Sequence, residues 1–259
     1  MSRRHAPCPA AGDGAVSGVR YRSEGITHPG AVRTHNEDAF VERTDIGLWA
    51  VADGAGGHEA GELASTMLVE ALGSIPAGLS ASELLAQVRL RVTATHSALR
   101  AEAARRGPRT TIASTLVVLL ARDNHFACLW AGDSRIYLLR DGALHQLTRD
   151  HSLVQELVDN GMLRPEEAEG HPRANVITRA IGADDAPPEL DKVSDRALPG
   201  DRFLLCCDGL NKTLPEPELA ALLGAGDTPA AALVEAALRR RATDNVTAIV
   251  VEAVMDPGA

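Results

Sequence analysis

The sequence predicts an α+β protein in which two antiparallel β-sheets pack together and helices cover them from outside. Two observations lead to this prediction. The periodic segments follow the order strands, two long helices, many strands, two helices and a last strand. Short polar turns at residues 122–124 and 140–142 join consecutive strands directly. Parallel strands would need a long crossover, usually a helix, between consecutive strands, so the order favours antiparallel sheets.

The first half of the chain carries the signals of three strands and two helices. Small and apolar residues recur at helical spacing over residues 60–71. A second helix begins with the capping-box pair Ser80 and Glu83 and ends at residues 105–108, where two arginines precede glycine and proline. We expect strands at residues 19–26, near residue 40 and at residues 48–52.

The second half begins with strand periodicity and is interrupted once. Residues 151–182 break the strand pattern with two short helices, one ending at Gly161 and one beginning at Pro165. Two later helices are expected. One covers residues 219–223, and the other is capped by Thr228. We expect strands at residues 113–121, 125–131, 135–138, 144–147, 191–198, 202–207 and 246–251.

The composition indicates a globular protein without a nucleic-acid or membrane partner. The 259 residues suffice for one large domain or two small ones, and 45% of them are hydrophobic. The net charge of −9 argues against nucleic acid and anionic membrane. No apolar run approaches the roughly 20 residues of a membrane span. We expect residues 1–18, rich in Ala, Gly and Pro, to be a disordered tail without the apolar core of a secretion signal.

The cysteines indicate buried free thiols. Cys128, Cys206 and Cys207 lie inside apolar strands, and neither they nor Cys8 form a Cys-x-x-Cys pair. This usage predicts a reducing cytoplasm. The alternative, Cys206 as a catalytic nucleophile, lacks the following arginine that would complete a phosphate-cradling loop.

Several aspartates stand at the ends of apolar runs. Asp53, Asp133 and Asp208 each end such a run beside glycine, and Asp244 precedes the last strand. Like charges brought close together need cations between them, and carboxylate oxygens suit Mg²⁺ or Mn²⁺ better than Zn²⁺. Each aspartate alone is more typical of a turn, and only the set taken together favours a metal site. For Asp133 a hairpin turn remains an equal alternative.

Other polar residues near these aspartates have candidate roles. Arg33 carries a planar fork that suits a phosphate dianion. Glu37 and Asp38 are candidates for holding metal-bound waters, and we place Asn245 in the same supporting group. His58 is either a general acid or a helix cap.

Seven short motifs in this order resemble one known family. The chain is similar to the protein phosphatase 2C family, the metal-dependent serine/threonine phosphatases, in its bacterial form. The resemblance covers roughly residues 20–252. The motifs lie at residues 33–38, 51–58, 113–116, 132–135, 147–151, 207–210 and 244–247.

The resemblance implies a fold and a metal-binding site. The family fold is a sandwich of two antiparallel β-sheets between antiparallel helix pairs (αββα). By resemblance, Asp53 bridges two Mn²⁺ or Mg²⁺ ions and the carbonyl of Gly54 binds the first. Asp208 and Asp244 complete the second. Asp133 is implied to share Asp208 in holding a third, weaker ion.

The resemblance also implies the reaction. We expect a single catalytic domain at residues 19–254 with a substrate-contacting flap at residues 151–182. A water that bridges two metal ions attacks phosphorus directly, without a covalent intermediate, while Arg33 and the metals absorb charge. The serine or threonine alkoxide leaves.

Two positions depart from the family pattern. Some members carry histidine directly after Asp-Gly, where this chain has Ala55, so either His58 or a metal-bound water protonates the leaving group. Asn211 and Lys212 stand where small residues are common, a departure that bears on substrate access.

The partners implied are phosphoserine and phosphothreonine proteins and a cognate serine/threonine kinase, with a monomeric enzyme. Residues 28–30, 151–156 and 171–179 resemble phosphatases paired with kinases that control type VI secretion, although stand-alone bacterial members share much of this. Two other classes are an inactive phosphoprotein-binding scaffold of the same fold and a hydrolase of small phosphoesters. The intact set Asp53, Asp208 and Asp244 argues against the scaffold, and the lack of a glycine-rich nucleotide loop argues against the hydrolase.

Overall fold

The computed structural model describes residues 18–168 and 170–255, without the side chain of His58. The tail predicted at residues 1–18 therefore lies, except for its last residue, outside the described part. None of the helices within the described ranges has the length and apolar character needed to cross a membrane.

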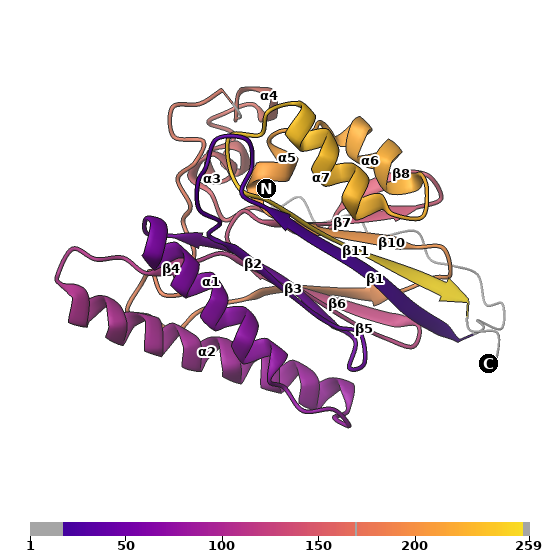
Figure 1. The fold of residues 1–259 in the computed structure, drawn as a ribbon, viewed down its shortest axis with the longest axis horizontal. Helices are drawn as coiled ribbons and strands as arrows, with labels where there is room; N and C mark the ends of the chain where they lie inside the picture. Colours follow the sequence, from indigo (N-terminus) through magenta and orange to yellow (C-terminus); the bar gives the residue numbers. More distant parts are fainter. Residues whose placement is uncertain (1–17, 169, 256–259) are drawn as a thin grey trace.

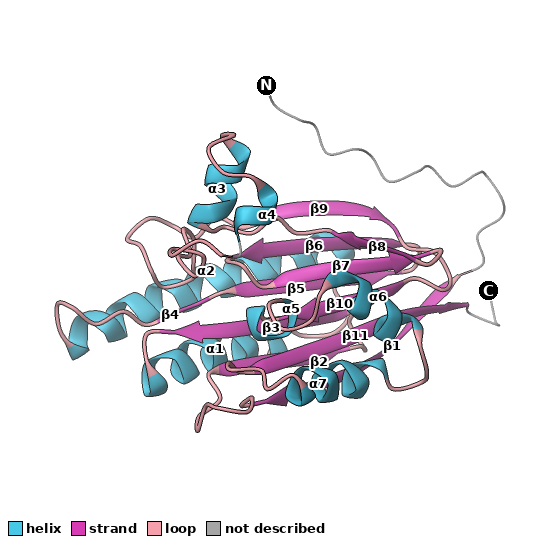
Figure 2. Ribbon diagram, turned by 90° about the horizontal axis from the view of Figure 1, so that it is seen from above, coloured by secondary structure: helices cyan, strands magenta, loops and turns pink. Residues whose placement is uncertain are grey.

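The strands form two antiparallel sheets that stack face to face (Figure 1, Figure 2). The first sheet has the strand order β1 (Val19–His28), β11 (Val246–Met255), β10 (Arg202–Cys206), β7 (Arg135–Arg140) and β8 (Ala143–Gln146). The second has the order β2 (Asp38–Arg43), β3 (Leu48–Ala55), β5 (Leu116–Arg122), β6 (His125–Ala131) and β9 (Asp191–Arg196), with β4 (Ala113–Ser114) paired to β3.

Helices cover the outer face of each sheet, as Figure 1 shows. The long helices α1 (His58–Gly73) and α2 (Ala81–Arg106) lie against the second sheet. The shorter α5 (Asp208–Asn211), α6 (Glu216–Gly224) and α7 (Pro229–Arg239) lie against the first. The remaining helices, α3 (Leu153–Asp159) and α4 (Pro165–Ala168), belong to the excursion predicted at residues 151–182. The predicted αββα sandwich is confirmed.

Alternating side chains of the strands build the layers. In β5, Leu116 and Val118 pack toward α1 and α2, whereas Val117 and Leu119 pack into the space between the sheets. Both faces of this strand are buried, which explains its unbroken apolar sequence. Burying one such side chain contributes about 1.5–3 kcal/mol to folding.

The strand boundaries correct the sequence prediction at the point where the second sheet meets the polar cluster. The predicted strand at residues 113–121 is broken at Thr115, whose backbone N–H donates to the carbonyl of Asp53 at 2.8 Å. The predicted strand at residues 48–52 instead continues to Ala55, because Gly54 and Ala55 pair with β4. Asp53 therefore lies inside β3 and not at its end. The short helix α5 was not predicted.

Candidate active site

Both sheets contribute aspartates to one end of the sandwich. Asp38 begins β2 and lies opposite Asp53 of β3 in the register of the second sheet. Asp208 follows β10 as the first residue of α5, and Asp244 lies two residues before the start of β11. The Oγ1 of Thr247, in β11, donates to Oδ2 of Asp38 at 2.6 Å and so connects the two sheets.

The carboxylates lie close enough to oppose one another's ionisation. Burial, followed by the charges of Asp38, Asp208, Asp133 and Asp244, raises the pKa of Asp53 well above its usual range. Burial also raises the pKa of Asp38 to about 7, although hydrogen bonds from Thr247 and Cys207 work in the opposite direction. These groups need a nearby cation to remain charged together at neutral pH.

The available donors fit a hard divalent metal. Five aspartates supply oxygen. The Sγ of Cys207, which also lies near them, is engaged: it accepts from the N–H of Thr247 at 3.1 Å and lies 3.3 Å from the carbonyl of Asn245. Within the described residues, no three His, Cys, Asp or Glu side chains stand close enough together to hold a metal ion by themselves. An open set of oxygens suits Mg²⁺ and Mn²⁺, because Mg²⁺ in particular usually keeps several waters when bound.

Gly54 lies at a close approach between elements. A Cβ at this position would lie 2.1 Å from the carbonyl oxygen of Gly61 in α1, so only glycine fits. Its N–H donates to the carbonyl of Glu37 at 3.1 Å. The Glu37 carboxylate in turn lies against Gly61, where a Cβ would stand 2.0 Å from Oε2. The start of α1 is thus held tightly against the polar end of β3.

Asn245 fastens the loop that carries Arg33. This buried amide accepts from the N–H of Glu37 at 2.9 Å and donates to the carbonyls of Pro29 and His35 at 3.0 and 2.9 Å. The loop between β1 and β2 is therefore fixed to the start of β11. Asn245 acts on the backbone of this loop, a role that the sequence prediction did not specify.

Arg33 reaches the carboxylate cluster from this loop. Its Nη2 lies 3.0 Å from Oδ2 of Asp244, and both side chains are about half exposed, at 52% and 46%. A guanidinium at the open rim of the cluster can turn toward an incoming anion without leaving a buried charge behind. The side chain of His58 is not described, so its predicted role stays a prediction.

Asp133 does not occupy a hairpin turn. It follows β6 of the second sheet and precedes β7 of the first, so the chain crosses between the sheets at this point. The alternative of a hairpin turn is wrong, because the two strands do not pair. Asp133 is buried, and its Oδ1 has no hydrogen-bond partner among the residues that the structure describes. Burial, together with the charge of Asp208, raises its pKa to about 6.

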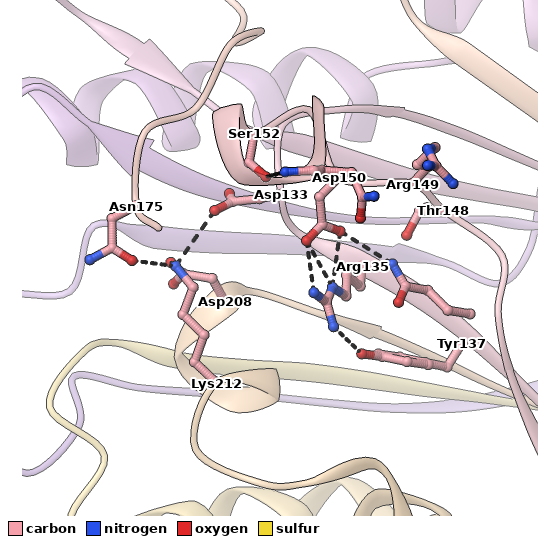
Figure 3. A network of polar contacts seen from close by, with 12 residues as sticks. Asp133, Arg135, Tyr137, Thr148, Arg149, Asp150, Ser152, Asn175, Asp208 and Lys212 are labelled. Carbon is pink, nitrogen blue, oxygen red and sulfur yellow. Dashed lines mark hydrogen bonds and ion pairs between the residues drawn. The ribbon is translucent and has the colours of Figure 1, made fainter. Parts of the chain in front are cut away.

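The structure adds a polar network that sequence reasoning missed. Nε and Nη2 of Arg135 donate to the two carboxylate oxygens of Asp150 at 2.9 and 2.7 Å, and its Nη1 donates to Tyr137 (Figure 3). Arg135 and Asp150 line a cavity of about 320 Å³ together with Asp133 and Lys212. Lys212 was recognised as a departure from a motif, but nothing in the sequence placed its ammonium among carboxylates.

The cysteines agree with the prediction of buried free thiols. Cys128, Cys206 and Cys207 are free and buried, and Cys8 lies outside the described residues. Burial raises the pKa of Cys206 to about 12. A thiol in this state is not a nucleophile at neutral pH, which removes the alternative of a cysteine phosphatase.

Comparisons with known proteins agree on one family. Residues 30–248 match the family model described as Protein phosphatase 2C. The serine/threonine protein phosphatase PstP of Mycobacterium tuberculosis is 39% identical over 227 residues, which cover 87% of this chain and 43% of PstP. This chain therefore spans less than half the length of that relative.

Solved structures superpose along nearly the whole chain. PppA, described as a key regulatory component of T6SS in Pseudomonas aeruginosa, has a TM-score of 0.85 and 46% identity, covering 92% of this chain and 99% of PppA. The catalytic domain of PstP in complex with two manganese ions has a TM-score of 0.77 and 36% identity, covering 91% of this chain and 99% of that domain.

Proposed function

Because this chain belongs to the protein phosphatase 2C family, we propose that it is a metal-dependent phosphatase that hydrolyses phosphoserine and phosphothreonine in proteins. The observation that carries the proposal is the group of aspartates around Asp53, whose mutual repulsion calls for divalent cations. An inactive scaffold of the same fold would have no use for such a costly arrangement of charges.

We assign the metal-binding roles to the residues that meet at this end of the sandwich. Asp53, the carbonyl of Gly54, Asp208 and Asp244 would hold the first two ions. Asp133, whose Oδ1 has no partner among the described residues, would help Asp208 to hold a third and weaker ion. The complex of the PstP catalytic domain with two manganese ions supports Mn²⁺ at the first pair of positions.

The protein's own residues bind and orient the substrate. When bound, the ions act as Lewis acids that lower the pKa of water and draw charge from the phosphoryl group. Arg33 turns from Asp244 to the phosphoryl oxygens and holds the dianion through its planar fork. Asn245 fixes the loop of Arg33 and thereby sets the distance between the guanidinium and the aspartates.

We place the protein substrate against the flap at residues 151–182. This segment forms one wall of the 320 Å³ cavity next to Asp133, through Ser152, Val154 and Asn175. We further propose a cognate serine/threonine kinase, a monomeric catalytic domain at residues 19–254 and a cytoplasmic location. The 46% identity to PppA supports a type VI secretion pathway as the setting.

The test is turnover of a phosphothreonine peptide by the purified chain with Mn²⁺, with excess chelator, and after Mn²⁺ is restored. We expect activity only when the metal is present. The Cys206→Ser variant is the control and should keep its turnover, because the buried thiol takes no part. Full activity in excess chelator would refute the metal mechanism.

A further inference from the structure

An ammonium group already lies between two of the proposed metal ligands. Lys212 follows α5, and its Nζ donates to Oδ2 of Asp208 at 2.6 Å and to Oδ1 of Asn175 at 2.9 Å. The same Nζ lies 3.6 Å from Oδ2 of Asp133 (Figure 3). Three oxygens from three distant segments thus surround one positive charge.

One carboxylate oxygen near this ammonium has no partner among the described residues. Asp133 exposes only 4% of its surface, and its Oδ1 has no partner among the described residues. Buried carboxylate oxygens without a partner are costly, so a group able to engage both oxygens of Asp133 would be favoured here. A divalent ion with its waters can do this, whereas the ammonium reaches only one oxygen.

The residue type is notable in this chain. The sequence contains twenty-four arginines but only two lysines, Lys192 and Lys212. A lysine ammonium is a compact point charge on a flexible stem, whereas the planar guanidinium of arginine needs more room. Among the basic side chains, the ammonium is therefore the closest in shape to a metal ion between carboxylates. The side chain of Lys212 is 40% exposed, so it can rotate away from the carboxylates into solvent.

We propose that Lys212 is an internal cation that occupies the third metal position between Asp133 and Asp208, so that a divalent ion binds there only after Lys212 has left. This inference rests on the proposed function for the identity of the third position. It explains how the chain keeps these carboxylates neutralised at low metal concentration. It also makes the third ion weaker than the first pair, because the ion must displace a bound charge.

The test counts Mn²⁺ ions bound to the metal-free protein by calorimetry and by the electron paramagnetic resonance signal of free Mn²⁺. We expect the wild type to bind two ions tightly and a third weakly. In Lys212→Met, the third should bind at least about tenfold more tightly, as follows if Lys212 fills the site about 90% of the time. Lys192→Met is the matched control, since it removes the other, exposed lysine, and its third ion should stay weak.

Further variants separate the outcomes. If Lys212→Met does not fold without metal, Lys212→Gln replaces it with a neutral polar side chain of similar reach. Adding Asp133→Asn to either variant should abolish the tightened third ion. Equal third-ion affinity in the wild type and the Lys212 variants would overturn the inference, and so would tightening that survives Asp133→Asn. If the wild type showed no phosphatase activity with Mn²⁺, the proposed function would be refuted. The comparison of third-ion affinity between the wild type and the Lys212 variants would still stand.

Discussion

Asp53 is a carboxylate in a group of like charges. It is surrounded by the charges of Asp38, Asp208, Asp133 and Asp244, and burial adds to their effect on its pKa. In the proposed function a metal ion relieves this repulsion, so Asp53 would lower stability without metal and would be required for activity with metal.

Replacing Asp53 by asparagine should therefore have opposite effects on stability and on activity. We expect Asp53→Asn to raise the melting temperature of the metal-free protein, because the neutral amide removes a buried repelling charge. Turnover should fall at least about 100-fold, since loss of metal assistance removes several kcal/mol of transition-state stabilisation. Differential scanning fluorimetry and phosphopeptide assays measure the two effects. A variant with lower metal-free stability and normal turnover would contradict both arguments.

Arg33 should contribute to substrate handling and little to metal binding. Removing a charged hydrogen bond to the phosphoryl group costs on the order of 2–4 kcal/mol. We expect Arg33→Ala to lower kcat/KM by roughly 30- to 1,000-fold, with the affinity for the two tight ions kept. Arg22→Ala is a matched control, because Arg22 is also exposed but pairs with Glu252. Lost metal binding with intact phosphopeptide affinity would count against this role.

The flap is held at its base and exposed at residues 159–162. Backbone hydrogen bonds join its two ends. The N–H of Leu153 donates to the carbonyl of Val176 at 2.9 Å, and the N–H of Thr178 donates to the carbonyl of His151 at 2.8 Å. Between these bonds lie α3, α4 and an exposed Met162. A segment anchored at its base and exposed at its tip can change its sequence without disturbing the two sheets.

Exchanging the tip of the flap should change substrate preference and leave the chemistry intact. We expect replacement of residues 160–174 by the corresponding segment of a relative to alter relative kcat/KM among phosphoproteins. Hydrolysis of a small aryl phosphate, which does not reach the flap, should stay within about threefold, a change below 1 kcal/mol. A parallel loss of both activities would mean that the tip is structural.

His96 connects α2 to the C-terminal end of the flap. It is buried, and its Nδ1 accepts from the N–H of Gly182 at 3.0 Å. Burial, followed by the charge of Arg100, lowers its pKa, although Asp184 and Asp185 act in the opposite direction. The folded protein therefore favours the neutral imidazole.

This contact should make stability depend on pH in a defined window. A histidine with a lowered pKa takes up protons more readily when unfolded, so stability is complete above about pH 6.5 and falls as the pH drops below that value. We expect His96→Asn, which keeps an acceptor but does not titrate, to lose stability less steeply between pH 6.5 and 5. The difference in slope is at most about 1.4 kcal/mol per pH unit. Urea unfolding at several pH values measures it, and equal slopes would contradict the argument.

For the whole molecule, metal binding and folding should be coupled. The aspartates come together only when both sheets have formed and stacked, so the folded state binds divalent ions better than the unfolded chain. At about 100 times the dissociation constant, one ion adds about 2.7 kcal/mol to stability. For a chain of this size that corresponds to a rise in Tm of roughly 5–10 °C.

Removing metal from the wild type should therefore lower Tm by at least that amount, and restored Mn²⁺ should reverse the change. Scanning calorimetry with and without chelator provides the measurement. Asp53→Asn serves as the control and should lose most of the response. If saturating Mn²⁺ left the Tm of the wild type unchanged, the ions would not bind a site formed by folding.

Local sequence was sufficient to predict most of the helices and strands. The capping box of Ser80 and Glu83 is present, and the helix it begins ends at Arg106, before Gly107. The apolar run of β5 is buried on both faces, as its unbroken hydrophobic pattern requires. The boundary of β3 was missed because its last two residues are small and pair with β4, which lies about 60 residues further along the chain.

The sequence by itself determined the strand and helix pattern and offered the candidate oxygen-bearing side chains, because charge, oxygen donors and strand periodicity are local properties. Only the tertiary structure decided how those residues meet. Asp133 became a buried crossing residue because β6 and β7 joined different sheets. Lys212 came to lie between Asp133 and Asp208 because α5 follows β10 closely in the chain. The flap brings Asn175 to the same ammonium. The physical reason is that sheet stacking brings together side chains as far apart as Asp38 and Thr247, separated by 209 positions, and no local pattern encodes that contact.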